Sequence, residues 1–277
     1  MKNIKKRMTL DEIRLVELDL LRHFKLFCQQ NNIHFFLSNG TLLGAVKYKG
    51  FIPWDDDIDV FVPRADYDKL IQKYKDNTQY CLFSIERNSS YRFPFAKLCN
   101  MKTIKIEDNI DNGVQLGVDI DIFPLDVWAN DHKAAEKQVK DQCRRIKILT
   151  FLKCRSATSL NPIKRVLKSI FVRIVHPFGI PFILKKIKKT ATAYTEYSTA
   201  LWRGCVSWCI YGRNEIVQAD VFRNTTDVIF EGDIYPAPIG FDSYLKSLYG
   251  NYNIDPPLNE QKTHHNYQAF FTTMREE

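Results

Sequence analysis

Apolar and polar positions along the chain alternate with two different periods, which predicts a mixture of helices and strands. Apolar residues recur every three or four positions in residues 10–28, 63–76, 131–152 and 241–249, the spacing of one buried helix face. Thr9 and Glu12 form a capping box, which predicts where the first helix begins. Apolar runs of strand length lie at residues 33–37, 80–86 and 93–98. This order of elements predicts an α+β fold.

Two further predicted strands carry acidic residues on one face. Asp57 and Asp59 alternate with apolar residues, and Asp119 and Asp121 repeat that pattern about sixty positions later. Residues two apart on a strand point to the same side, roughly 6.8 Å apart along the chain. Because each pair lies on an otherwise apolar strand, we expect neighbouring strands that present their acids to one site.

Carboxylates held close together need a cation or a proton beside them. Two that stand about 4 Å apart repel by roughly 4 kcal/mol near a protein surface, and ligand sets made only of oxygen suit Mg²⁺ or Mn²⁺. The plainer alternative is a solvated acidic turn, but Pro53 and Trp54 place this cluster beside an apolar region. A helix-loop-helix calcium site is excluded, because Val60 stands where its glycine is required and Asp66 where its glutamate is required.

A phosphate site is predicted just ahead of the first acidic strand. Gly40 and Thr41 precede a short apolar helix at residues 42–46, and the N–H groups at a helix N-terminus bind anions. Lys97, within an apolar strand, is a second candidate phosphate contact, with an ordinary surface charge as the alternative. The chain contains neither a dinucleotide-binding glycine motif nor a Gly-Lys-Ser/Thr phosphate loop.

The positive charge of the chain is concentrated in one segment. The formal net charge is +8, whereas residues 140–189 alone contain 14 Lys or Arg and one acid, so the remainder of the chain is acidic. Within this segment, residues 163–175 have a helical apolar stripe with basic flanks. The stripe fits a core-facing helix and equally a helix on the anionic inner leaflet of a membrane. Nucleic acid is not expected as a partner, because the basic residues stand among bulky aliphatics rather than stacking aromatics.

Composition also indicates the cellular compartment. No apolar run reaches the roughly 18 residues that suggest a membrane span, and acidic residues follow the basic start of the chain where a signal peptide would need an apolar region. We therefore expect a cytoplasmic protein, peripheral on the inner face of the cell membrane if the basic segment docks there. The seven cysteines are scattered without a Cys-x-x-Cys pair, which predicts reduced thiols.

Three motifs together resemble a known family. Gly40-Thr41, the run Pro53-Trp54-Asp55-Asp56-Asp57-Ile58-Asp59 and the block Asp121-Ile-Phe-Pro-Leu-Asp126 are similar to the LicD family of bacterial phosphocholine transferases and to the catalytic domain of fukutin-related protein. The resemblance covers most of the chain and is weakest at residues 140–200. It implies a nucleotidyltransferase-like mixed β-sheet core flanked by helices, with a basic, mainly helical insertion. The predicted boundaries are a catalytic core at 1–135, the basic segment at 136–200 and a C-terminal part at 201–277 that completes the core and cleft.

The resemblance also implies roles for individual residues. Asp57 and Asp59 would bind metal with support from Asp55, and Asp121 would be the third carboxylate, ahead of Asp119. Residues implied in donor binding are Gly40, Thr41 and Lys97, and those implied in substrate binding are Trp54, Tyr252 and His265. A His pair such as His264-His265 is, on its own, more typical of a surface or a packing contact. The chain departs from many relatives at Asn251, where they have an acid.

The implied activity is a metal-dependent transfer that uses two Mg²⁺ or Mn²⁺ ions. Phosphocholine or a related phospho-alcohol would pass from a CDP-alcohol donor to a sugar hydroxyl of a cell-surface glycan precursor, lipid-linked or oligosaccharide, with release of CMP. The alcohol stays open among choline, ethanolamine, glycerol and ribitol. Two other classes stay open as well: a glycosyltransferase with an Asp-x-Asp metal site and a nucleotide-sugar donor, and a non-catalytic binding protein.

Overall fold

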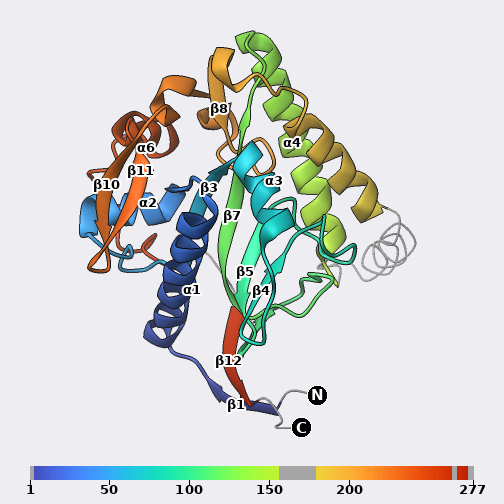
Figure 1. Cartoon of the computed structure of the whole chain (residues 1–277), viewed down its shortest axis with the longest axis vertical. Coiled ribbons are helices and arrows are strands. Elements are labelled where there is room, and N and C mark those ends of the chain that lie inside the picture. Colours follow the sequence, from blue (N-terminus) through green and yellow to red (C-terminus); the bar gives the residue numbers. More distant parts are fainter. Residues whose placement is uncertain (1–2, 156–178, 264–266, 274–277) are drawn as a thin grey trace.

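The computed structural model describes residues 3–155, 179–263 and 267–273. Its centre is a mixed sheet in the order β2-β3-β7-β5-β4, with β8 and β9 added beside β7 (Figure 1). The bounds of these strands are β2 Phe36–Leu37, β3 Asp59–Pro63, β4 Tyr80–Phe83, β5 Ala96–Asn100, β7 Val118–Val127, β8 Trp202–Gly204 and β9 Val217–Gln218. The expectation of an α+β protein with a mixed sheet is confirmed.

The two acidic strands lie side by side. β3 and β7 run parallel, and their register sets Asp59 opposite Asp121. β5 runs antiparallel on the other side of β7, with Lys97 opposite Asp121. Parallel neighbours that are buried on both faces favour continuous apolar runs, and both strands have this composition outside the acidic positions. The prediction of neighbouring acidic strands is confirmed for Asp59 on β3 and for Asp119 and Asp121 on β7, whereas Asp57 precedes β3.

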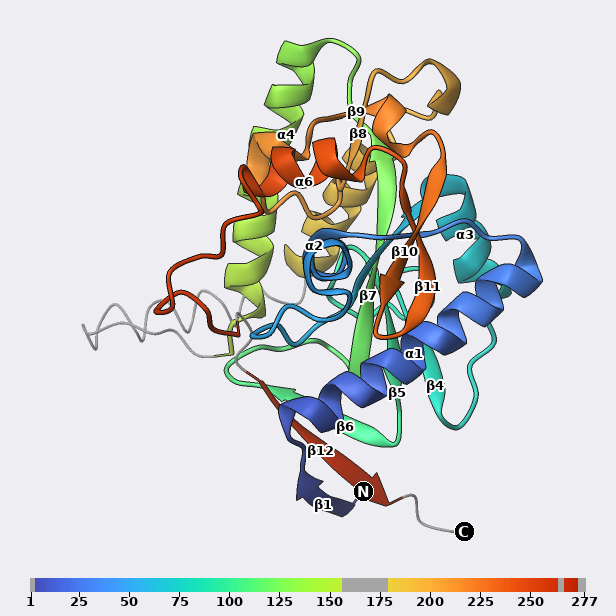
Figure 2. The same cartoon turned by 90° about the vertical axis from the view of Figure 1, so that its left-hand side faces the viewer.

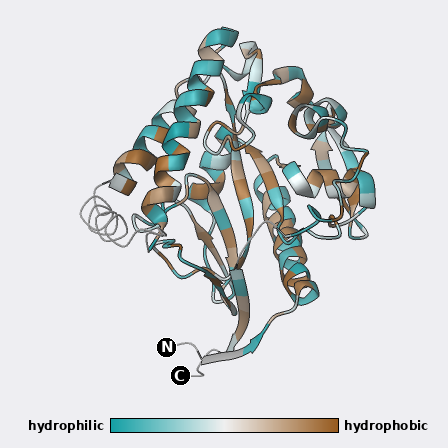
Figure 3. Ribbon diagram, turned by 180° about the vertical axis from the view of Figure 1, so that it is seen from behind, coloured by the Kyte–Doolittle hydropathy of each residue, from teal (hydrophilic) through white to brown (hydrophobic). Residues whose placement is uncertain are grey.

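Helices and a hairpin pack around this sheet. α1, Leu10–Asn31, contacts β7 and β5, whereas α3, Arg64–Lys73, contacts β3 and β7. α2, Asn39–Tyr48, lies between β3, the hairpin of β10 (Thr225–Phe230) and β11 (Asp233–Pro238), and α6, Phe241–Tyr249 (Figure 2). Figure 3 shows the central strands as mainly hydrophobic ribbons, which agrees with a core that α1 and α6 help to cover.

A second hydrophobic core lies beside the first. The amphipathic helix α4, His132–Lys153, buries Val139, Ile146 and Leu149 against apolar residues of the helical stretch 179–191. The basic residues of α4 therefore accompany a core-facing stripe. The predicted stripe at 163–175 lies outside the described residues. None of the described helices combines the length and the apolarity that crossing a membrane requires.

A three-stranded sheet unites both ends of the chain. β1, Asn3–Arg7, and β6, Thr103–Glu107, flank β12, Tyr267–Thr273, in antiparallel pairs. The sheet lies at the lower end of the molecule in Figure 1, next to both termini. The hydrophobic pattern did not predict these strands.

Most predicted elements are present, with corrected bounds. The capping box at Thr9 and Glu12 begins α1 as expected, and Asp131 caps α4. Three strand predictions were too long: β2 is a two-residue strand instead of the run 33–37, β4 ends at Phe83 instead of residue 86, and β3 begins at Asp59. Asp57 therefore lies in the segment that leads into β3 rather than on the strand itself. The strand predicted at 93–98 lies at Ala96–Asn100. All seven cysteines are free, as predicted.

Candidate functional site

A cleft of about 570 Å³ opens where β3 begins. Its acidic wall combines Asp55, Asp57 and Asp59 with Asp121 of β7, beside Asn39 and Gly40 at the start of α2. Its other walls are largely aromatic and include Tyr48, Trp54, Trp208, Tyr211, Tyr249 and Tyr252. The cleft thus joins carboxylates, a helix N-terminus and flat apolar surfaces in one space.

Local hydrogen bonds hold the start of β3 against α2. The Asp59 N–H donates to Thr41 Oγ1 at 2.8 Å, and Asn39 Nδ2 donates to Asp59 Oδ2 at 3.1 Å. Asn39, whose backbone is left-handed with φ 45°, is itself held by a 2.7 Å bond from the Tyr244 hydroxyl. These contacts place the helix N-terminus beside the Asp59 carboxylate.

The segment before β3 is held by α1. Arg14 donates to the backbone carbonyls of Ile52, Pro53 and Asp55 at 2.7–3.1 Å. On the other side the Asp55 carboxylate touches the helix start, because a Cβ added at Gly40 would lie 2.7 Å from Asp55 Oδ2. Glycine at this position lets the carboxylate and the helix N-terminus approach each other.

Burial and mutual repulsion disfavour the charged forms of these acids. Burial raises the pKa of Asp55 to about 8, and the neighbouring Asp57 adds to the shift. Burial also raises the pKa of Asp59 well above its usual value, with Asp57 and Asp121 contributing. The pKa of Asp121 is raised to about 6 by burial against the opposing effect of Lys97. A group of carboxyls with this property has a strong tendency to bind a cation.

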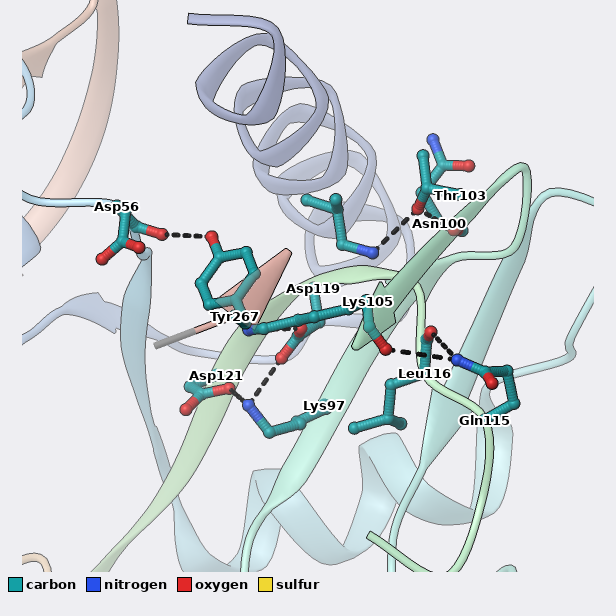
Figure 4. A network of polar contacts seen from close by, with 11 residues as sticks. Asp56, Lys97, Asn100, Thr103, Lys105, Gln115, Leu116, Asp119, Asp121 and Tyr267 are labelled. Atoms are coloured by element: carbon teal, nitrogen blue, oxygen red, sulfur yellow. Dashed lines mark hydrogen bonds and ion pairs between the residues drawn. The ribbon is translucent and has the colours of Figure 1, made fainter. Parts of the chain in front are cut away.

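Asp119 has different surroundings, which Figure 4 shows. Lys97 Nζ lies 2.5 Å from Asp119 Oδ2 and also contacts Asp121, and Lys105 Nζ lies 2.9 Å from Asp119 Oδ1. The side chains of Asp119, Lys97 and Lys105, here called the Asp119 cluster, are nearly inaccessible to solvent. Although burial alone would raise it, Lys105 and Lys97 hold the pKa of Asp119 below its usual range.

The predicted site residues therefore fall into separate groups. Lining the cleft are Asp55, Asp57, Asp59, Asp121, Gly40, Trp54 and Tyr252. Thr41 and Asp119 are buried behind its wall, and Lys97 is committed to the two aspartates of β7. His265 lies outside the described residues.

The donor set suits a divalent cation with oxygen ligands. Asp55, Asp57, Asp59 and Asp121 share one cleft, and their carboxyls offer the hard oxygen donors that Mg²⁺ and Mn²⁺ prefer. In the described part of the chain, no three potential ligand side chains already stand together as a formed metal site. The fit consequently rests on the chemistry and charge of the donors.

Several residues that line the cleft or support its walls escaped the sequence analysis. Asn39 and Arg14 act through local hydrogen bonds that no hydrophobic period reveals, and Glu215 belongs to a short 3₁₀ turn without a recognisable motif. The aromatic residues Trp208 and Tyr211 lie far from the acids in sequence. Only the tertiary fold brings them to the same cleft.

Comparison with known proteins agrees with this geometry. The mixed sheet, with carboxylates on adjacent strands beside a helix N-terminus, is the arrangement that the resemblance to a nucleotidyltransferase-like core led us to expect. Residues 32–148 match the family model described as LicD/FKTN/FKRP, nucleotidyltransferase domain. The resemblance stated from the sequence is confirmed.

One relative extends the similarity over nearly the whole chain. The lipopolysaccharide cholinephosphotransferase LicD of Haemophilus influenzae is 29% identical over 276 residues, which is 96% of this chain and 99% of the relative. An uncharacterised protein of Rickettsia typhi is 32% identical over 74 residues, a quarter of either chain. The prediction of an enzyme of the phosphotransferase class agrees with the name of the full-length relative and with the matched domain.

Proposed function

We propose that the protein transfers phosphocholine from CDP-choline to a sugar hydroxyl of a lipopolysaccharide-type glycan and releases CMP. The observation that carries this proposal is the meeting of Asp57, Asp59 and Asp121 with the α2 N-terminus in one cleft. The similarity to a cholinephosphotransferase over nearly the full length supports the same reaction. In the transfer, the bond from the acceptor oxygen to the choline-bearing phosphorus forms as the bond from that phosphorus to CMP breaks.

The acidic wall supplies the groups that such a transfer needs. Asp57 and Asp59, with Asp55 beside them, would hold Mg²⁺ or Mn²⁺, whose bound charge would offset the negative charge of the phosphates. Asp121 would accept the proton of the acceptor hydroxyl, and a pKa of about 6 suits a general base near neutral pH. Lys97, which contacts Asp121, would orient this carboxylate instead of contacting the donor phosphate directly.

The start of α2 would bind the donor phosphates. Asn39 and Gly40 line the cleft there, and backbone N–H groups at a helix N-terminus favour phosphate. The Thr41 hydroxyl accepts a hydrogen bond from the Asp59 N–H, which assigns it to the support of β3. Phosphate binding by this segment would therefore rely on its backbone.

The test is a transfer assay with purified protein, CDP-choline, Mg²⁺ and a delipidated lipopolysaccharide oligosaccharide. We expect stoichiometric CMP and an acceptor that gains one phosphocholine by mass spectrometry. Asp59→Asn should lower the rate about a thousandfold or more, whereas the control Asp227→Asn, on the exposed side of β10, should match wild type. Wild-type rates in folded Asp59→Asn would refute the assignment, and turnover of UDP-glucose instead would favour a glycosyltransferase.

The basic segment would bring the enzyme to its acceptor. Residues 140–189 carry 14 basic side chains and one acid, and each Lys or Arg near an anionic membrane surface contributes about 1 kcal/mol of attraction. We expect the protein to sediment with phosphatidylglycerol vesicles at low salt, to be released by high salt and to ignore phosphatidylcholine vesicles. Equal recovery with both lipids would contradict a peripheral location on the inner membrane face.

A further inference from the structure

A group of aromatic side chains forms one end of the cleft. Tyr211 and Tyr249 stack edge to face with ring centroids 5.3 Å apart, and their hydroxyls lie 2.9 Å from each other. Trp208 packs edge-on against Phe95 at 5.4 Å, which fixes its indole in the same wall. Each of these three rings, Trp208, Tyr211 and Tyr249, is thus packed against another aromatic ring.

A buried carboxyl group stands among these rings. Glu215 lines the cleft but is only 1% exposed, and its Oε2 has no hydrogen-bond partner among the residues that the structure describes. Burial raises the pKa of Glu215 to about 8, although the backbone N–H groups of Cys205 and Tyr211 oppose the shift. A buried carboxyl oxygen without a hydrogen-bond partner is destabilising, so a ligand that interacts with this oxygen would be favoured.

Among the described residues, no Lys or Arg side chain provides a positive charge to pair with the Glu215 carboxylate, since none of the ion pairs found there includes Glu215. The complementary ligand group is a cation that needs no hydrogen-bond acceptor. A quaternary ammonium meets this description, because it is positively charged, donates no hydrogen bond and binds to the faces of Trp and Tyr rings. A primary ammonium would leave its N–H donors with one available oxygen.

We propose that Glu215, Trp208, Tyr211 and Tyr249 form the subsite for the trimethylammonium head of the transferred phosphocholine. The inference rests on the proposed function and deepens it, since it selects choline from the alcohols that the sequence left open. Ethanolamine lacks the methyl groups, and glycerol and ribitol lack the charge.

The subsite adjoins the acidic wall. Asp59, Tyr211 and Tyr249 line the same cleft, and burial, followed by lesser causes that include the Asp59 carboxylate, raises the phenol pKa of both tyrosines. A phosphocholine group is short, so its phosphorus and its ammonium must bind in neighbouring parts of one cleft. The arrangement of Asp59 and the aromatic rings meets that requirement.

The test compares two donors of the same shape. CDP-choline and its uncharged isostere CDP-dimethylbutanol, in which carbon replaces the nitrogen, are titrated by calorimetry into the full chain with Mg²⁺, and CMP is titrated as the nucleotide control. We expect wild type to bind CDP-choline about tenfold more tightly than the isostere. Glu215→Gln should abolish this preference, and Tyr211→Leu should reduce it severalfold, with CMP affinity unchanged within about twofold.

Matched variants make the outcome specific. Glu136→Gln and Tyr194→Leu change a glutamate and a tyrosine outside the cleft lining and should retain the tenfold preference. If Glu215→Gln does not fold, as judged by circular dichroism, Tyr211→Leu carries the same comparison. Equal binding of both donors by wild type, or a preference that survives in folded Glu215→Gln and Tyr211→Leu, would overturn the subsite while leaving the proposed transfer intact.

A further experiment tests the ammonium subsite independently of whether CDP-choline is the donor. If neither CDP compound binds wild type, the proposed function fails, and tetramethylammonium is then titrated alone by thermal shift. A stabilisation that Glu215→Gln abolishes supports a quaternary ammonium site, and no stabilisation of wild type overturns it.

Discussion

The two Asp-x-Asp pairs have the same sequence pattern and opposite surroundings. Asp119 of β7 is enclosed by Lys97 and Lys105, and its charge is compensated within the protein. Asp59 of β3 receives one hydrogen bond from Asn39 and faces the cleft, and no ion pair with a Lys or Arg is found for it in the described ranges. Asp121 combines both kinds of surroundings, since it contacts Lys97 and also lines the cleft.

This contrast shows that the neighbouring strands determine whether an aspartate is paired with a lysine or faces the cleft. β7 lies between β3 and β5, so one side of its acidic end meets a lysine-bearing strand and the other meets more acids. A buried ion pair that loses one partner leaves an uncompensated charge, which is strongly destabilising. An acid that faces a cleft instead repels its neighbours until a ligand binds. The comparison therefore separates an aspartate that has a lysine counter-charge, Asp119, from aspartates that face the cleft, to which the proposed function assigns the chemistry.

The largest expected effect is on the functional side of the comparison. Asp121→Asn removes the proposed proton acceptor and should lower the transfer rate about a thousandfold, with a small change in stability because Lys97 keeps its contact with Asp119. Steady-state kinetics and urea unfolding of the same preparation measure both quantities. A loss of stability as large as that of Asp119→Asn would erase the distinction between the two positions.

Asp119→Asn should act in the opposite way. The buried Lys97 and Lys105 would lose their shared counter-charge, and we expect the free energy of unfolding to fall by about 3–5 kcal/mol. Urea denaturation followed by circular dichroism measures this change, with Asp227→Asn as the surface control. An unfolding curve that coincides with wild type would contradict a structural role for the Asp119 cluster.

Gly40→Ala tests how closely the acids and the helix N-terminus must approach. The added Cβ would lie 2.7 Å from Asp55 Oδ2 and displace that carboxylate, so we expect about a tenfold to hundredfold lower transfer rate. Gly232→Ala in the β10–β11 turn is not a matched control, because Gly232 has a left-handed backbone with φ 82°. Val46→Ala, at a partly buried position of the same helix outside the cleft lining, is a better one, and an unaffected rate in Gly40→Ala would argue against phosphate binding at this end of α2.

The smallest expected effect is a pH dependence of stability without metal. Asp55 has a pKa of about 8 in the folded chain and 3.8 as its ordinary value, so the folded state binds the proton more tightly. Its contribution to stability is complete at low pH and is lost as the pH rises through about 8. Thermal unfolding should therefore show a decline toward alkaline pH that Asp55→Asn reduces. A slope identical in wild type and Asp55→Asn would contradict this origin.

The sequence predicted the framework of the fold because the strongest patterns are local. The capping box of α1 and the alternation in β7 depend on neighbouring residues and appear where expected, whereas β3 begins two residues later than its alternation predicted. The strands β1, β6 and β12 were missed because they are held together by pairing between both ends of the chain and an internal segment. Such pairing leaves little trace in a local hydrophobic period.

The candidate site could be predicted only in part for a related reason. The acidic run from Asp55 to Asp59 can be recognised in the sequence by itself, and Asp121 can be predicted because the second strand repeats the Asp-x-Asp pattern. Whether an acid faces a lysine or a cleft depends on strand order, which is why Asp119 and Lys97 looked like site residues in the sequence alone. Glu215 carries no local signal and became visible only through its burial in an aromatic wall.

The central claim is that the carboxylates of the cleft, and not those of the Asp119 cluster, bind the metal required for transfer. Electron paramagnetic resonance of Mn²⁺, titrated into wild type, Asp59→Asn and Asp227→Asn with CMP present, measures this binding directly. We expect bound Mn²⁺ in wild type and in Asp227→Asn, and at least about tenfold weaker binding in Asp59→Asn. Equal Mn²⁺ affinity in all three proteins would contradict the account.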